Sequence, residues 1–332
     1  MGGLFTTLGG QARNWIGRLN TDGSLDIGFD PRPGGDVRSP GVDCVIVQAD
    51  GKILVVGSFN VLGGQLRNCI GRLNVNGTLD SGFNPGADVG VSSLAVQADG
   101  KILVGGEFST LRGQPRSGIG RLNANGTLDS GFNPGAGGGG YVSSLAVQPD
   151  GKILVGGSFL SLGGQPRKHI ARLDNTALAT QSLTCDGSTI TWLRGGTSPE
   201  VWRTTFDASA NGTDWLRLGA GSRIPGGWRL TGASVPPGGT IRARGYVTGG
   251  DKSSGWFVES LAVATEPIRL SCILDGKELV LSWTGGQGPY QLQQTATLSD
   301  TVSWEDAGPA VPGNSTRLPV GSGSRFLRVR GQ

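Results

Sequence analysis

The chain has 332 residues, a net charge of +4 at neutral pH and 61 glycines, which follow no Gly-X-Y period. This composition excludes collagen and indicates many tight turns, and no apolar stretch is long enough to predict a membrane-spanning helix. The Lys and Arg residues are scattered singly, so a nucleic-acid partner is not predicted.

The first half of the chain repeats one phrase. QADGKILVVGSF begins at Gln48, and close variants begin at Gln97 and Gln148. Each phrase belongs to a longer unit that contains IGRLN or IARLD, and the arginines of these segments are Arg18, Arg72, Arg121 and Arg172. Short strands that recur with a period of about forty to fifty residues indicate a β-propeller.

Each complete unit is predicted to form a four-stranded antiparallel blade. Asp-Gly pairs at 50–51, 99–100 and 150–151 separate two apolar runs, and such pairs predict type I′ hairpins with positive φ at both residues. The run KILVGG is apolar on both faces, as expected between neighbouring blades, and its glycines predict close approach of adjacent sheets. The IGRLN and GTLD segments supply the two outer strands.

The combination of DGKILVGG, GxxR, IxRLNxDGxLD and FNPG resembles the delta-60 repeat, a bacterial β-propeller repeat of large secreted or surface proteins whose function is mostly unassigned. The resemblance covers Gly2 to Asp174 and rests on four agreeing copies. It implies a propeller fold and an extracellular or cell-surface location of the parent protein. It implies little chemistry.

The repeats are incomplete at both ends. Met1 falls inside a unit, and the last unit stops at Asp174 without a GTLD segment. We therefore expect two complete and two partial blades, whereas a closed propeller usually has about four to eight. A fragment of a longer gene is the favoured explanation, and it would also account for the lack of a visible signal peptide. The alternatives are partial blades that combine across the ring and closure by association. Unpaired blade edges predict self-association.

Beyond the repeats, alternating segments separated by Gly, Asn and Pro turns predict two β-sandwich modules of immunoglobulin or fibronectin type. The predicted division is 1–174 for the propeller repeats, 175–265 for the first sandwich and 266–332 for a second, fibronectin-like sandwich. The whole chain is therefore predicted to be all-β.

Seven of the eight tryptophans lie in these two modules. Residues two apart on a strand share a face, and this parity places Trp192, Trp228 and Trp283 with apolar neighbours in the cores. Trp215 and Trp202 share their faces with polar or mixed neighbours. They are the candidate residues for stacking on a carbohydrate or another small molecule.

The inventory of reactive residues is small. His169 is the single histidine, and its column in the other units holds Trp15, Cys69 and Gly118, which predicts a variable surface position rather than a general base. No motif of a hydrolase, zinc enzyme or phosphate-binding loop is present. Four cysteines have no metal-ligand spacing and are predicted to be mostly buried thiols: Cys44, Cys69, Cys185 and Cys272.

Four acidic residues break the repeat pattern and are the candidate metal ligands. Asp36, Asp43 and Asp88 lie near the starts of inner strands, and Glu107 replaces the Ser of other copies. Calcium prefers six to eight oxygen ligands in proteins, so these carboxylates could hold Ca²⁺ near the central axis. Pairing with a nearby arginine, or exposure at the blade rim, is the alternative for Glu107.

Two functions follow from these observations. The favoured one is a non-catalytic, extracytoplasmic binding or surface scaffold, whose ligand would be a small molecule or a carbohydrate. The alternative is a Ca²⁺-dependent hydrolase of small lactones or esters. That alternative rests on fold-level analogy with six-bladed lactonase propellers, in which calcium polarises an ester carbonyl. No cofactor other than Ca²⁺ is suggested.

Overall fold

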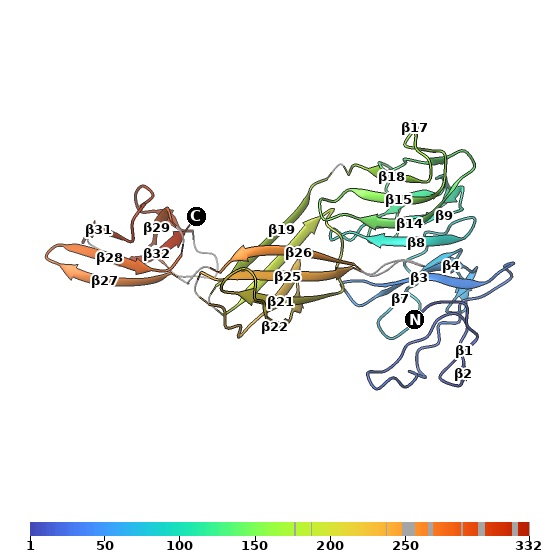
Figure 1. Ribbon diagram of the computed structural model, residues 1–332, viewed down its shortest axis with the longest axis horizontal. Coiled ribbons are helices and arrows are strands. Elements are labelled where there is room, and N and C mark those ends of the chain that lie inside the picture. The colour runs from blue at the N-terminus through green and yellow to red at the C-terminus, as the bar shows by residue number, and fades with distance from the viewer. Residues whose placement is uncertain are drawn as a thin grey trace.

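The computed structural model describes residues 1–332 except 176, 187, 237, 248–255, 265–267, 287, 298–302, 321–324 and 332. All the elements of regular secondary structure in these described residues are β-strands, so the all-β prediction is confirmed. Figure 1 shows an elongated molecule with the repeats at one end, the first sandwich in the middle and the second sandwich at the other end.

Three units form three-stranded antiparallel sheets of one design, which we call the second, third and fourth blades. The second blade has the order β3 (Gly41–Val47), β4 (Ile53–Ser58) and β7 (Ile70–Leu73). The third has β8 (Val91–Val96), β9 (Ile102–Gly106) and β12 (Ile119–Leu122). The fourth has β14 (Tyr141–Val147), β15 (Ile153–Ser158) and β18 (Ile170–Leu173).

The first blade, residues 1–29, lacks the first two strands of this design. It is held by single bridges that pair Gly2 with Ile16 and Leu19 with Leu25. Every unit also carries a small hairpin at its LGGQ or LRGQ segment. These hairpins are β1 (Thr7–Leu8) with β2 (Gln11–Ala12), β5 (Val61–Leu62) with β6 (Gln65–Leu66), β10 (Thr110–Leu111) with β11 (Gln114–Pro115), and β13 (Ala136–Gly137) with β16 (Ser161–Leu162) and β17 (Gln165–Pro166).

The predicted fourth strand of each complete blade is reduced to one bridge. Leu73 pairs with Leu79, and Leu122 pairs with Leu128. The chain turns away at once, because the Asp80 carboxylate accepts a hydrogen bond from the Gly82 backbone N–H. The GTLD segment is therefore a short outer edge rather than a full strand.

The hairpins between the first two strands of each blade were predicted to be type I′ turns, and this prediction is wrong. Gly51 has a φ of 80°, whereas Asp50 does not have a positive φ. The Gly51 N–H donates to the Gln48 carbonyl and the Gln48 N–H donates to the Lys52 carbonyl, the pattern of a type I turn followed by a left-handed glycine. The Asp50 carboxylate accepts from the Lys52 N–H at 3.0 Å, and this bond stabilises the three-residue loop.

The paired glycines of KILVGG have two different functions. A Cβ at Gly105 would lie 2.7 Å from Cγ1 of Val142 in the next blade, so the predicted close approach of adjacent sheets is confirmed there. A Cβ at Gly106 would lie 2.4 Å from the Gly90 carbonyl oxygen of its own blade. The second glycine thus fits the β-bulge that interrupts the register between Val91 and Ser93.

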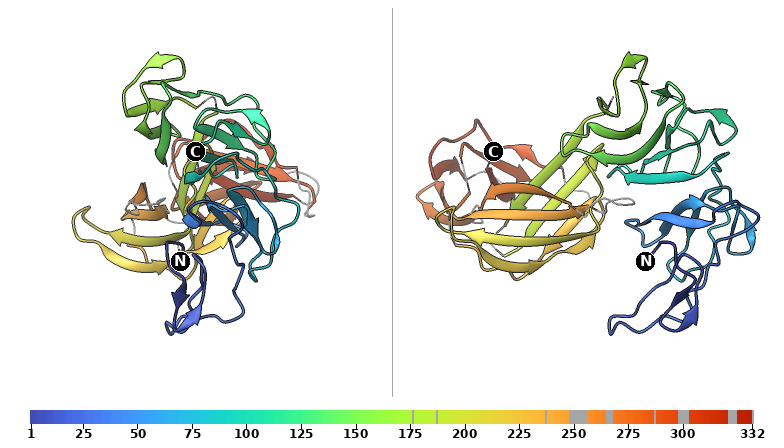
Figure 2. Two further views of the ribbon diagram at one scale, coloured as in Figure 1. Left: turned by 90° about the vertical axis from the view of Figure 1, so that its right-hand side faces the viewer. Right: turned by 45° about the vertical axis from the view of Figure 1, so that its right-hand side comes forward.

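The repeats have no core inside a single blade. One hydrophobic cluster joins the first and second blades, another joins the second and third, and a further one joins the third and fourth. Figure 2 shows the blades side by side along an arc, with the first and fourth at its two ends. Each blade is therefore stabilised through its neighbours, as in other repeat proteins.

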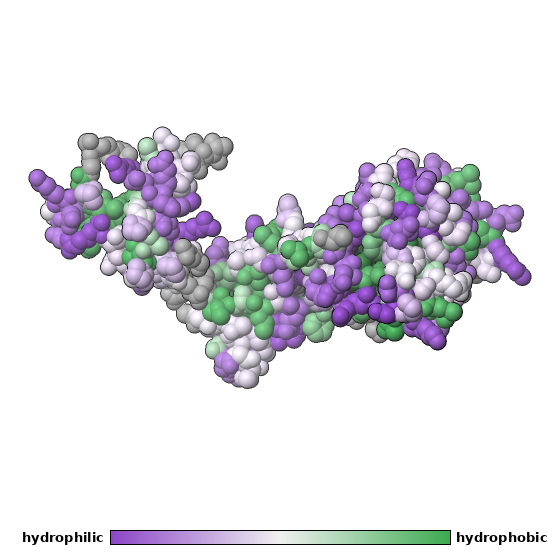
Figure 3. All heavy atoms as spheres, turned by 90° about the horizontal axis from the view of Figure 1, so that it is seen from above, coloured by the Kyte–Doolittle hydropathy of each residue, from purple (hydrophilic) through white to green (hydrophobic). Residues whose placement is uncertain are grey.

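The first sandwich consists of two four-stranded sheets around one core. One sheet has the order β19 (Ala179–Cys185), β20 (Ile190–Gly196), β24 (Gly227–Leu230), β23 (Ser222–Ile224). The other has β22 (Leu216–Ala220), β21 (Arg203–Ser209), β25 (Thr240–Val247), β26 (Trp256–Val263). Trp192 and Trp228 lie in the core, as predicted. Figure 3 shows hydrophobic patches over this middle part of the molecule.

The second sandwich has two three-stranded sheets and a small core that includes Trp283, also as predicted. Its strands are β27 (Arg269–Asp275), β28 (Glu278–Thr284) and β31 (Ser315–Pro319) in one sheet, and β30 (Glu305–Asp306), β29 (Tyr290–Thr295) and β32 (Phe326–Gly331) in the other. The boundaries predicted at 174/175 and 265/266 stay predictions, and residues 265 and 266 lie outside the described residues.

Candidate ligand site at the junction of the blades and the first sandwich

The polar residues that recur in the repeats are bound to one another. In the third blade Asp129 accepts hydrogen bonds from Nε of Arg121 and Nζ of Lys101, both at 2.9 Å. The guanidinium of Arg121 also lies 4.5 Å from the ring centroid of Phe132. Burial acts to raise the pKa of Asp129, but these donors and their charges outweigh it and hold the pKa below its ordinary value.

The same arginine also links the second blade to the third and the third blade to the fourth unit. Nη1 of Arg72 donates to the Ala124 carbonyl of the third blade at 2.7 Å, and Nη1 of Arg121 donates to Oδ1 of Asn175 at 2.7 Å. The arginine of IGRLN, the aspartate of GTLD, the lysine of DGKI and the phenylalanine of GFNP thus form one structural cluster. Sequence reasoning found the motif but missed this cluster, for which the constant spacing of arginine and aspartate was the available signal.

Two of the predicted metal ligands lie near Cys69. Burial raises the pKa of the Cys69 thiol, and the charges of Asp88 and Asp43 add to that shift. The Asp88 carboxylate accepts hydrogen bonds from the backbone N–H groups of Ser109 and Thr110, each at 2.9 Å. Asp88 therefore fixes a loop to the start of the next hairpin. Asp43 lies at the β-bulge of β3, where the register shifts between Val42 and Cys44.

The other two predicted ligands are exposed. Asp36 lies in the loop before β3, and Glu107 follows the end of β9. Among the residues that the structure describes, no group of three or more His, Cys, Asp or Glu side chains is placed to hold a metal ion. The calcium site remains a prediction that this geometry does not support.

The two candidate tryptophans differ in their surroundings. Trp215 is half-buried, and the guanidinium of Arg242 lies 3.9 Å from its ring centroid, so one ring face is already covered. Trp202 is 50% exposed and lines a cavity of about 200 Å³ between the blades and the first sandwich.

The repeat position that His169 occupies has the same unusual backbone conformation in all four units. His169 is exposed, whereas Cys69 and Gly118 are buried, so the prediction of a surface position is wrong for two members. All four members have left-handed backbone, with φ of 61° at Trp15, 63° at Cys69, 67° at Gly118 and 66° at His169. Of the other cysteines, Cys44 and Cys185 are buried and Cys272 is exposed.

The first sandwich is joined to the third blade by backbone pairing. The Ala98 N–H donates to the Ser198 carbonyl at 2.7 Å, and the Asp99 N–H donates to the Gly196 carbonyl at 3.0 Å. Gln97 forms an antiparallel bridge with Pro199. The hairpin edge of the blade and the segment after β20 are thus held like neighbouring strands.

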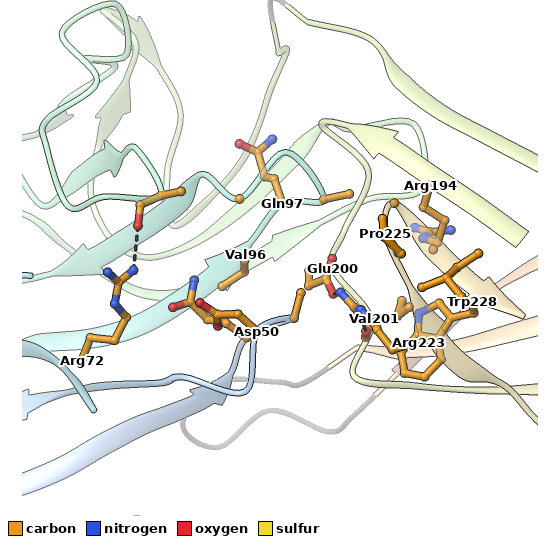
Figure 4. Close-up of a pocket in the computed structure, with 18 residues that line it drawn as sticks. Asp50, Arg72, Val96, Gln97, Arg194, Glu200, Val201, Arg223, Pro225 and Trp228 are labelled. Atoms are coloured by element: carbon orange, nitrogen blue, oxygen red, sulfur yellow. Dashed lines mark hydrogen bonds and ion pairs between the residues drawn. The ribbon is translucent and has the colours of Figure 1, made fainter. Parts of the chain in front are cut away.

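A cavity of about 570 Å³ lies beside this pairing. Figure 4 shows Arg72 and Asp50 of the second blade on one side, Arg194, Arg223 and Trp228 of the first sandwich on the other, and Glu200 between them. Clefts of about 300 to 1,000 Å³ at the boundary between structural units are common ligand sites.

Charged groups are buried at the sandwich side of this cavity. Glu200 forms an ion pair with Arg223, and burial raises the pKa of Glu200 although both nearby arginines act to lower it. Arg194 is 8% exposed and donates to the Pro199 carbonyl at 3.0 Å. Burial lowers the pKa of Arg194 to about 10, so its guanidinium still carries a positive charge at neutral pH.

Comparison with known proteins supports the repeat assignment. A family model described as "Domain of unknown function (DUF5122) beta-propeller" matches residues 1–29, 48–83, 97–132 and 148–176. The repeats are therefore similar to β-propeller repeats of unassigned function. The delta-60 name stays a prediction. No curated protein matches the chain.

Two solved structures of fibronectin domains show a low similarity to the chain. The chicken CNTN1 FN1-FN3 domains are 12% identical, with 74% of this chain and 92% of that chain covered and a TM-score of 0.24. The central fibronectin-III array of RIM-binding protein is 11% identical, with 91% and 93% covered and a TM-score of 0.17. Both similarities are weak, and the two sandwiches are defined by the strand pairing of the chain itself.

The junction site was missed by sequence reasoning. Gln97 and Pro199 are far apart in the sequence, and Arg194, Glu200 and Arg223 belong to no repeated motif. No local pattern predicts that a blade hairpin pairs with a segment of the first sandwich.

Among the residues that the structure describes, no helix is long and apolar enough to cross a membrane.

Proposed function

We propose that the protein is a non-catalytic binding or surface scaffold in which the blades and the first sandwich act as one rigid ligand-binding unit. The architecture of propeller repeats followed by sandwich modules is that of a binding or scaffold protein. The observation that carries the proposal is the direct backbone pairing of the third blade with the first sandwich beside a cavity of about 570 Å³.

The location of the parent protein is part of the proposal. The resemblance to secreted and surface repeat proteins favours an extracellular or cell-surface position. The ligand would be a small molecule or a carbohydrate, and the scattered basic residues give no support to nucleic acid.

The alternative of a calcium-dependent lactone or ester hydrolase has weaker support. It needs Glu107, Asp43 and Asp88 to share one cation, whereas Glu107 is exposed and the Asp88 carboxylate is already bonded to backbone N–H groups. The repeated carboxylates Asp80 and Asp129 are bonded to Lys and Arg side chains.

The test is a hydrolysis screen of lactones and esters with purified full-length chain, with and without a calcium chelator. A scaffold is expected to show no turnover above the buffer rate in either condition. Turnover that the chelator removes would overturn the proposed function in favour of the hydrolase.

Self-association through the open end of the blades is a second element of this proposal. The outer face of the fourth blade exposes Ile170, which is 69% exposed, and exposed apolar strand surfaces promote association. Light scattering of the full chain should show oligomers at high concentration, and Ile170→Lys should shift the mass toward the monomer. A parent chain that stays monomeric would remove this element.

A further inference from the structure

One face of the fourth blade stays open, although the same face is buried in the second and third blades. Figure 2 shows the fourth blade at the end of the arc. Residues that pair directly across neighbouring strands share a face of the sheet, and in the fourth blade none of the residues on this face is buried. We call them the open face, and they form two rows across the strands: Ser144, Gly156 and Ile170 in one, and Ala146, Leu154 and Arg172 in the other.

The interface between the third and fourth blades shows what covers this face elsewhere. A Cβ at Gly105 would lie 2.7 Å from Cγ1 of Val142 and 3.1 Å from Cδ1 of Leu145, both in β14. The Leu145 N–H donates a hydrogen bond to Oγ of Ser93 at 3.1 Å. The interface therefore uses two apolar side chains of an incoming first strand and one hydrogen bond to a serine hydroxyl. The first strands of the other complete blades carry the same apolar pair: Val42 with Val45, and Val91 with Leu94.

The open face keeps the groups that such an interface uses. Gly156 and Ser144 stand at the positions of Gly105 and Ser93 in the repeat, and Ser144 is exposed. A Cβ at Gly156 would meet no described atom nearer than Cβ of Ser144, at 3.8 Å. Ile170 beside it is 69% exposed. An incoming strand can therefore approach this face as closely as β14 approaches the third blade.

Arg172 completes this pattern, because it lacks the acceptor that its counterparts have. Nη1 of Arg72 donates to the Ala124 carbonyl and Nη1 of Arg121 donates to Oδ1 of Asn175, each at 2.7 Å. Each acceptor lies three residues after the arginine of the following unit. Arg172 is exposed and has no hydrogen bond or ion pair among the described residues. A following unit would supply an acceptor at this place.

We propose that the open face docks a further unit of this repeat that belongs to another protein chain. The apolar pair of its first strand would lie against Gly156 and Ile170, and a backbone N–H of that strand would donate to Ser144. An acceptor three residues after its own arginine would meet Arg172. The proposal rests on the proposed scaffold function and names the partner of this surface.

The fit favours another repeat protein over a second copy of this chain. After Asp174 the chain continues into the first sandwich, so no fifth unit follows the fourth blade. Its own first strands are already covered, since Val42, Val91 and Val142 are at most 2% exposed. Copies that associate through Ile170 would use only the apolar part of the open face.

The experiment is calorimetric titration of the full chain with a hairpin peptide of residues 141–158, at a concentration at which light scattering shows a monomer. Tyr141 and Ser158 pair across the strands, so Tyr141→Cys and Ser158→Cys in the peptide form a disulfide that closes the hairpin. Circular dichroism verifies its strand content before the titration. The control peptide also carries Val142→Ser and Leu145→Ser. The closed hairpin should bind at least about tenfold more tightly than the control, because each buried apolar side chain contributes about a factor of ten.

Three variants of the full chain test the location. Ile170→Lys should weaken binding of the hairpin at least about tenfold, because docking would bury its charge. Gly156→Leu adds no charge but fills the space that the apolar pair would occupy, and it should weaken binding by a similar factor. Ile27→Lys is the control, since Ile27 is 78% exposed in the first blade at the other end of the arc, and it should leave binding unchanged.

The proposal is overturned if the paired hairpin binds no more tightly than the control peptide, or if both folded open-face variants bind it as the parent does. Oligomers of the parent that the hairpin does not dissociate would assign the face to a second copy instead. Failure of docking without any lactone turnover leaves the scaffold function standing. Chelator-sensitive turnover would overturn the scaffold function itself, so the two failures are distinguishable.

Discussion

The third and fourth blades have nearly the same sequence but different surroundings. Ile119 in the third blade is 0% exposed, whereas its counterpart Ile170 is 69% exposed. A Cβ at Gly105 would lie within 3.1 Å of two side chains of the next blade, while one at Gly156 would meet only Ser144 of its own blade, at 3.8 Å. The motif is therefore the same, and the neighbour decides whether it is buried.

The comparison shows which features of a blade depend on its own sequence and which depend on the following blade. Strand pairing is encoded within the unit, since β14, β15 and β18 pair in the same register as the strands of the third blade. Burial of the outer face comes from the following unit. Nearest-neighbour interfaces of this kind contribute a large part of the stability of repeat proteins.

The largest expected difference in unfolding free energy between the two blades comes from truncation of the equivalent isoleucines, Ile119 and Ile170. Ile119→Ala should lower the free energy of unfolding by about 2 to 5 kcal/mol, because it opens a cavity between two blades. Ile170→Ala should change it by less than about 0.5 kcal/mol in dilute, monomeric protein, because the side chain is exposed in the single chain. Urea unfolding of both variants measures the difference. Similar losses would mean that the face of the fourth blade is covered in solution.

The charged cluster of the third blade is the next test. Asp129→Ala should destabilise the protein by about 1 to 3 kcal/mol, because it leaves the buried Arg121 without its carboxylate. In the fourth blade, Lys152 lies 3.7 Å from Asp150, and the two side chains are 37% and 54% exposed. Asp150→Ala should therefore cost less than about 1 kcal/mol. Equal losses of unfolding free energy in the two variants would contradict a stabilising role of the buried cluster.

The same cluster predicts a pH dependence with a defined sign. Hydrogen bonds hold the pKa of Asp129 below its ordinary value despite burial, so its stabilising contribution is complete above the unfolded-state pKa of about 3.9 and is lost as the pH falls through the folded-state pKa. The difference in stability between the parent and Asp129→Ala should shrink below about pH 4. A difference that grew in acid would reverse this sign.

Much of the fold could be predicted from the sequence, because local patterns encode it. The Asp-Gly hairpins, the apolar KILVGG strands and the core positions of Trp192 and Trp283 are all confirmed in place. The type I′ turn was wrong, because the carboxylate of Asp50 bonds to the Lys52 N–H and stabilises a longer loop.

The candidate site could not be predicted in the same way. Its residues come from two blades and from the first sandwich, and they meet where residues 97–99 of the third blade pair with residues 196–199 after β20. The residues that did attract attention, such as Glu107, did so because they break the repeat. A break in a repeat also arises where a position is simply exposed, as Glu107 is.

A smaller effect is expected at the repeat position of Gly118 and His169, where the backbone is left-handed. The third and fourth blades are compared again. Gly118→Ala should destabilise the third blade by about 1 to 2 kcal/mol, because a left-handed backbone is unfavourable for a residue with a Cβ. His169→Gly should stabilise the fourth by about 0.5 kcal/mol, since it relieves that strain at a small entropic cost. His169→Ala is the control and should bring no gain. A gain equal to that of glycine would point to the imidazole rather than the backbone.

The smallest effect is expected at Glu107, the residue that follows β9 in the third blade and that the calcium hypothesis requires. Its side chain is exposed, so Glu107→Gln should change the free energy of unfolding by less than about 0.5 kcal/mol. Calcium should leave the melting temperature of the parent unchanged, because a ligand stabilises a protein only when it binds the folded state in preference to the unfolded one. Magnesium at the same ionic strength is the control for general salt effects. A calcium-specific rise in melting temperature that Glu107→Gln abolishes would restore the metal site, and with it the hydrolase alternative.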